Sequence, residues 1–136
     1  MKRNRRVCEY VECDASKYCV GACLVREFQG KQHPIAFTSA KLSGAQLHWA
    51  AIESEAWAVI HALKKFDAFV YGRRITLVTD NNPLVYITKS MPNSGKLVRW
   101  NLAIQRYNIV KTIHRKGIHN SNCDALSRLF TTEDVP

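Results

Sequence analysis

Three short stretches of apolar and β-branched residues open the chain and predict strands over residues 7–14, 19–26 and 34–39. Turn-like segments at 15–18 and 29–31 separate these strands. Because turns this short join antiparallel neighbours, the first third of the chain is predicted to form an antiparallel three-strand meander.

Helical periodicity follows the meander. Ser43 and Gln46 have the spacing of a capping box, and an alanine-rich helical pattern continues to about residue 69. Apolar residues recur at intervals of three and four, as on the buried face of a helix, at Ile52, Ala56, Val59, Ile60, Leu63 and Phe66. The pattern predicts that residues 43–69 form the longest helix of the chain.

The remainder alternates between strands and helices. The predicted elements are a strand at 75–79, a short helix from 81–83 through 87, a loop at 90–95, a helix at 97–107, a strand at 109–114 and a last helix at 120–129. This order predicts an α/β fold with a mixed sheet and helices packed on it. We assign one domain to residues 7–130, a basic tail to 1–6 and a short tail to 131–136.

Composition narrows the possible functions. A chain of 136 residues that are 46% hydrophobic fits one globular domain. No apolar run approaches the roughly 20 residues of a membrane-spanning helix, and residues 1–6 lack the apolar core of a secretory signal. We therefore expect an intracellular protein with no membrane partner, in either the cytoplasm or the nucleus. Twenty Lys and Arg against eleven Asp and Glu give a net charge of +9, which favours nucleic acid as the partner.

The five cysteines indicate neither a disulfide framework nor a zinc site, because their number is odd and no two are spaced C-x-x-C. Cys13, Cys19 and Cys23 share a parity, so we expect them to lie as reduced, buried thiols on one face of paired strands.

Two acidic residues fall at the carboxyl ends of predicted strands, where open α/β sheets place ligands. If the strands that precede Asp14 and Asp80 are parallel neighbours, these carboxylates lie side by side, and a divalent cation such as magnesium or manganese would neutralise their repulsion. The alternative is that each aspartate only starts a turn. The residues themselves leave both interpretations open.

Several motifs in register resemble the ribonuclease H domain of gypsy-type LTR retrotransposon polyproteins. They are residues 13–16, 53–63, 78–84 and 114–128, with further agreement at 33–37 and 71–73. The resemblance covers about residues 11–129. It implies a ribonuclease H-like fold, in which a five-stranded mixed sheet (the antiparallel meander plus two parallel strands) has helices on both faces. It also implies that four carboxylates bind two Mg²⁺ ions, or Mn²⁺, and that the enzyme cuts the RNA strand of RNA–DNA hybrids.

The resemblance assigns the four metal-binding, catalytic acids by position to Asp14, Glu55, Asp80 and Asp124. His114 precedes the last acid by ten positions and matches the flexible-loop histidine of cellular and retroviral ribonucleases H. A histidine there could transfer a proton or assist product release.

The helical acid requires a choice between two glutamates. Glu53 and Glu55 are two residues apart on a helix and point about 200° apart, so one of them can face the metals. The resemblance selects Glu55, and we expect Glu53 to lie on a solvated face.

The residues that would contact the substrate are indicated by less specific patterns than the four acids. Ser16 and Asn82 could bond sugar hydroxyls or base edges of the hybrid, although turn or cap chemistry explains them almost equally well. Arg115 and Lys116 are expected to contact phosphates. Other cations in the later part of the chain could add to these contacts, namely Lys89, Lys96 and Arg99. Trp57 and Trp100 are expected in the core.

The leading hypothesis is therefore a metal-dependent endonuclease that hydrolyses the RNA strand of RNA–DNA hybrids during reverse transcription. The resemblance implies a reverse transcriptase polymerase domain as a partner, and this chain contains no such segment. One alternative is a catalytically silent nucleic-acid-binding or structural remnant of a retroelement polyprotein. Another is a different nuclease or a transposase of the same broad fold.

Overall fold

The computed structural model describes residues 7–80, 83–90 and 94–114. Their strands are β1 (Val7–Ala15), β2 (Cys19–Phe28), β3 (Lys31–Lys41), β4 (Arg74–Thr79) and β5 (Asn108–His114). Their helices are a 3-10 helix (Gly44–His48), α1 (Ala51–Lys65), α2 (Asp67–Val70), α3 (Pro83–Ser90) and α4 (Gly95–Gln105). The predicted last helix, residues 120–129, lies outside the described residues.

The strands form one five-stranded sheet in the order β3-β2-β1-β4-β5. The first three strands pair antiparallel, whereas β4 pairs parallel with both β1 and β5. At the β2–β3 hairpin, Gln29 and Gly30 both have positive φ (54° and 79°), as a two-residue type I′ turn requires. The predicted meander and the two added parallel strands are confirmed.

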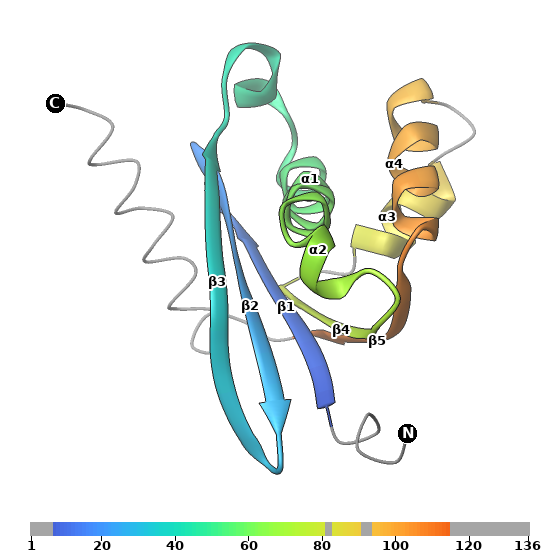
Figure 1. The fold of residues 1–136 in the computed structure, drawn as a ribbon. Coiled ribbons are helices and arrows are strands. Elements are labelled where there is room, and N and C mark those ends of the chain that lie inside the picture. Colours follow the sequence, from blue (N-terminus) through green and yellow to red (C-terminus); the bar gives the residue numbers. More distant parts are fainter. Residues whose placement is uncertain (1–6, 81–82, 91–93, 115–136) are drawn as a thin grey trace, which may run out of the picture.

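The described helices lie on one face of the sheet (Figure 1). Helix α1 packs directly on β1 and β2, α3 packs on α1, and α4 packs on α3 and α1. The main core lies between α1 and the sheet, where Val11, Leu24 and Leu77 from the strands meet Val59 and Leu63 from α1. In the described part of the chain, no helix is long and apolar enough to cross a membrane.

The predicted single helix over residues 43–69 is wrong. The Ser43–Gln46 pair does cap a helix, with the Ser43 amide donating to Gln46 Oε1 at 3.0 Å, but that helix is the short 3-10 segment. Trp49 and Ala50 are extended, and α1 begins at Ala51. Phe66, at φ −95° and ψ 11°, separates α1 from α2. The three–four spacing of apolar residues continues across these breaks, because apolar side chains keep facing the core while the backbone changes direction.

The prediction that three cysteines share a face is also wrong. The β1–β2 register pairs Cys13 with Ala22 and Glu12 with Cys23, so Cys13 faces α1 while Cys23 lies on the opposite face near Tyr10. Sequence parity does not carry across a hairpin whose register is unknown. The expectation of buried thiols is confirmed for Cys13, Cys19 and Cys23. Burial raises the pKa of the Cys13 thiol, which keeps it protonated.

A polar cluster joins α2 to the segment that leads into β5. Asp67 accepts from Arg106 Nε at 3.0 Å, from Arg106 Nη2 at 3.3 Å and from the Tyr107 hydroxyl at 2.6 Å. Hydrogen bonds from Arg106 and then Tyr107 lower the pKa of the Asp67 carboxyl. The cluster thereby ties the end of α4 to the end of the α1–α2 layer.

Replacing Leu63 by Ala should lower the free energy of unfolding by about 2–5 kcal/mol, because a cavity remains between α1 and the sheet. Leu102→Ala is the matched control, since Leu102 is 61% exposed and Leu63 is 1% exposed. Urea unfolding of both variants measures the difference. If both variants lost the same free energy of unfolding, the main core would not lie between α1 and the sheet.

Asp67→Asn should lower the melting temperature at pH 7 and have less effect as the pH falls. The folded-state pKa of Asp67 is depressed, so its contribution to stability is present above its ordinary pKa of 3.8 and is lost as the pH falls through the lower folded value. Thermal melts at pH 7 and at low pH test this dependence. A difference between wild type and variant that is the same at both pH values would contradict the linkage.

Candidate functional site

The candidate site lies at the carboxyl ends of the parallel strands β1 and β4. Their register pairs Glu12 with Val78, and two residues further along each strand are Asp14 and Asp80. The condition set by the sequence, that these two strands are parallel neighbours, is therefore met. Both aspartates come to the same edge of the sheet.

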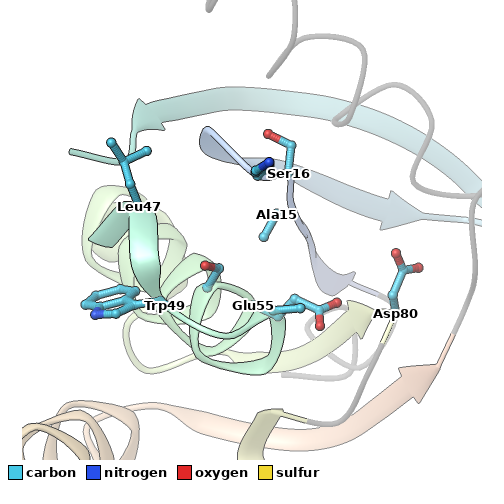
Figure 2. A pocket seen from close by; sticks show the side chains of 9 residues that line it. Ala15, Ser16, Leu47, Trp49, Glu55 and Asp80 are labelled. Atoms are coloured by element: carbon cyan, nitrogen blue, oxygen red, sulfur yellow. The ribbon is translucent and has the colours of Figure 1, made fainter. Parts of the chain in front are cut away.

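A cavity of about 690 Å³ opens at this edge (Figure 2). It lies between the β1–β2 turn, the segment that leads into α1, the first turn of α1 and the end of β4. Its lining residues are Ala15, Ser16, Lys17, Leu47, Trp49, Ala51, Ser54, Glu55 and Asp80. The cavity thus has acidic groups at one end and an apolar wall of Leu47 and Trp49 at the other, and Lys17 is also among its lining residues.

Two of the predicted acids share this cavity. The side chain of Glu55 extends from α1 toward Asp80 (Figure 2). Asp80 Oδ1 is buried and, among the described residues, has no hydrogen-bond partner. A buried carboxylate oxygen without a donor is costly, and carboxylate oxygens are the ligands that Mg²⁺ and Mn²⁺ prefer. The chemistry of this pair therefore fits a divalent cation.

Asp14 stands beside the cavity rather than in its lining. Its Oδ1 accepts from the backbone N–H of Ala15 at 2.9 Å. Among the residues that the structure describes, no three His, Cys, Asp or Glu side chains form a group that could hold a metal ion. Asp124, the fourth predicted acid, lies outside the described residues.

Ser16 has a structural role in the β1–β2 turn. Its Oγ accepts from the backbone N–H groups of Tyr18 at 3.3 Å and Cys19 at 3.1 Å, and it donates to the Cys19 carbonyl at 3.1 Å. The turn chemistry that the sequence left open is therefore present. Ser16 also lines the cavity, so the same residue holds the turn and borders the site.

His114 ends β5 and is exposed. Its register partner on β4 is Thr79, the residue before Asp80. The sheet therefore brings the candidate proton-transfer group to the edge that carries the acids. The other predicted contacts with substrate, Asn82, Arg115 and Lys116, lie outside the described residues.

One expectation about a charged residue needs correction. Glu53 does not lie on a solvated face, because its Oε2 accepts from Lys96 Nζ at 2.6 Å and its side chain is 23% exposed. The Lys96 side chain in this ion pair is 27% exposed. Arg99 is exposed, as a phosphate contact requires.

Of the two tryptophans expected in the core, Trp100 is buried and Trp57 is partly buried.

The sequence did not reveal the far wall of the cavity. Trp49 and Leu47 reach it because the chain is extended between the 3-10 helix and α1, whereas helical periodicity through residues 43–69 gave them no distinct place. The sequence assigned Lys17 to a turn. Its position directly after Ser16, a predicted substrate contact, was the signal that could have placed it at the cavity.

Comparison with known proteins identifies the family. Residues 8–107 match the family described as "RNase H-like domain found in reverse transcriptase". The chain is 36% identical over 121 residues to the retrovirus-related Pol polyprotein from transposon opus of Drosophila melanogaster, a match that covers 88% of this chain and 12% of the relative. It is 33% identical over 132 residues to the transposon Tf2-3 polyprotein of Schizosaccharomyces pombe, over 93% of this chain and 10% of that one. The chain therefore spans about a tenth of these polyproteins.

Solved structures share the fold. The foamy viral protease-reverse transcriptase dRH in complex with double-stranded DNA matches with a TM-score of 0.67 and 18% identity, over 85% of this chain and 21% of that one. LC11-RNase H1, isolated from compost, matches with a TM-score of 0.63 and 15% identity, over 96% and 99% of the two chains. The matched sequence and the shared fold agree that the chain belongs to the RNase H-like domains found in reverse transcriptases, with retrotransposon Pol polyproteins as its relatives.

Proposed function

We propose that the protein is a metal-dependent endonuclease that hydrolyses the RNA strand of RNA–DNA hybrids during retrotransposon reverse transcription. The observation that carries this proposal is the cavity lined by Glu55 and Asp80 beside Asp14; within the described part of the chain, one buried oxygen of Asp80 has no hydrogen-bond partner. A protein of the same fold, LC11-RNase H1, has been solved in complex with an RNA/DNA hybrid at a TM-score of 0.58 and 15% identity.

Mg²⁺ is the proposed cofactor, as two ions, and Mn²⁺ could replace it. Its ligands would be Asp14, Glu55, Asp80 and Asp124. Bound in this place, the ions would stabilise the attacking and leaving oxygens of phosphodiester hydrolysis, which leaves 3′-hydroxyl and 5′-phosphate ends. The chain's proposed contribution is to hold acids from β1, α1 and the end of β4 at one sheet edge.

His114 is the proposed proton carrier. Its imidazole nitrogens lie at the exposed end of β5, beside the strand that leads into Asp80, where they could take a proton from water or give one to the leaving oxygen. Ser16, Asn82, Arg115 and Lys116 are the proposed contacts with the hybrid. A polymerase domain is the proposed partner, because related polyproteins extend far beyond the matched segment.

Asp80→Asn should abolish cleavage of the RNA strand and leave hybrid binding intact. Even outer-shell changes at metal sites cost about 10–100-fold in activity, so loss of a direct ligand should cost more. Cleavage of a labelled RNA–DNA hybrid at low salt, with Mg²⁺, with Mn²⁺ and with chelator, measures the effect. Unchanged cleavage by the variant would contradict the assignment.

Glu27→Gln is the matched control, because Glu27 lies at the other end of β2 and glutamine can still accept from the Tyr10 hydroxyl. Parallel assays with double-stranded RNA and double-stranded DNA separate a hybrid-specific enzyme from other nucleases of this fold. A folded wild-type protein that binds the hybrid and cuts none of these substrates would instead identify a silent binding module.

A further inference from the structure

Lys96 occupies an unfavourable place for a lysine. It is the second residue of α4, whose N-terminus carries a partial positive charge, and its side chain is only 27% exposed. Ser94 already supplies the cap of α4 by accepting from the Leu97 amide at 3.3 Å. The position of Lys96 is therefore explained by partners outside its own helix.

Those partners come from the segment that begins α1. Lys96 Nζ donates to Glu53 Oε2 at 2.6 Å and lies over the Trp49 ring, 4.3 Å from its centroid. It also lies 5.3 Å from the centroid of Trp100, and the two indole rings meet edge to face at 5.6 Å. A cation held by both a carboxylate and aromatic faces is fixed in place more firmly than a surface ion pair.

Glu53 contributes to the cap of α1. The N-cap residue of this helix is Ala50, which has no side-chain acceptor for the unpaired amides of the first turn. Glu53 compensates in part, because its Oε1 accepts from the Ala50 amide at 3.3 Å. Its two oxygens thus join Lys96 on one side to the start of α1 on the other.

This turn is also a wall of the cavity. Ser54 and Glu55 follow Glu53 directly and line the cavity, and Trp49, the ring beneath Lys96, lines it as well. Figure 2 shows Trp49 and Glu55 on the two sides of this turn. Lys96 therefore contacts Trp49, which lines the cavity, and Glu53, which precedes two lining residues, although Lys96 itself is not among the lining residues.

We propose that Lys96 is a positioning residue that, through Glu53 and Trp49, fixes the first turn of α1 and so aims the Glu55 carboxylate at Asp80. This inference rests on the proposed function of the site. It replaces the expectation that Lys96 contacts phosphate, and the two roles predict different kinetics.

Lys96→Met should lower kcat and the affinity for Mg²⁺ by roughly 10–100-fold while leaving KM for the hybrid unchanged, since outer-shell partners of metal sites have effects of this size. Methionine keeps the length of the side chain and its contact with the tryptophans but removes the charge. Lys64→Met, on the exposed last turn of α1, is the matched control and should behave as wild type. Calorimetry with Mg²⁺ and no substrate gives the affinity, and steady-state cleavage gives kcat and KM.

Two further variants test the path through Glu53. Lys96→Arg should restore most of kcat, because arginine also pairs with carboxylates and stacks on aromatic rings. Glu53→Gln should resemble Lys96→Met, and the double variant should be no worse than either single change, since both break one linkage. Additive losses would contradict a shared path.

A third readout does not depend on catalysis. Hydrogen exchange at the amides of Ser54 and Glu55 should quicken in Lys96→Met and stay unchanged in Lys64→Met, because the first turn of α1 opens locally. A raised KM with a smaller salt dependence and an unchanged kcat would overturn the proposal in favour of a phosphate contact. Unchanged exchange together with unchanged Mg²⁺ affinity would also overturn it. If wild type shows no cleavage, the proposed function fails, while exchange and Mg²⁺ binding still decide the role of Lys96.

Discussion

The parallel pairing of β1 with β4 is the constraint on which the candidate site depends. Parallel strands cannot be joined by a hairpin, so the chain must leave the meander, cross the face of the sheet and return. Helix α1 makes that crossing and packs on β1 and β2. As a result, the ends of β1 and β4 and the first turn of α1 meet at one edge, and residues far apart in sequence, such as Glu55 and Asp80, line one cavity.

The sequence was sufficient to predict the strands, because they depend on local patterns, but it placed Asp14 and Asp80 at one edge only on the condition that their strands are parallel neighbours. Alternation and turn residues predicted the meander, and an acid after each of two apolar strands predicted where β1 and β4 end. The breaks around α1 could not be predicted in the same way. The extended backbone at Trp49 and Ala50 continues an apolar pattern that a helix would also satisfy, and its placement depends on contacts with α4 that lie more than forty residues away.

Glu53 shows why the choice between neighbouring acids needed tertiary structure. Periodicity allowed either glutamate to face the metals, and resemblance selected Glu55. The structure gives Glu53 a different function from the solvated one expected, since its two oxygens bind the Ala50 amide and Lys96. Sequence spacing does not contain this pairing, because α4 lies about forty residues further along the chain and meets α1 only in the folded structure, where both helices also contact α3.

Two acids, Glu9 and Asp80, differ in how the described residues compensate their charge. Within the part of the chain that the structure describes, each has one buried oxygen without a hydrogen-bond partner, although Asp80 as a whole is only partly buried. Glu9 is 1% exposed, and its other oxygen pairs with Arg26 at 2.7 Å, so its charge is neutralised within the sheet. Within the described residues, Asp80 has no such ion pair and instead borders an open cavity with Glu55. A carboxylate oxygen that lacks a donor is compensated either by protonation or by a bound cation, and carboxylate oxygens are the ligands that divalent cations prefer. This environment of Asp80, more than the count of acids in the sequence, is the reason that we propose a metal ion at the site.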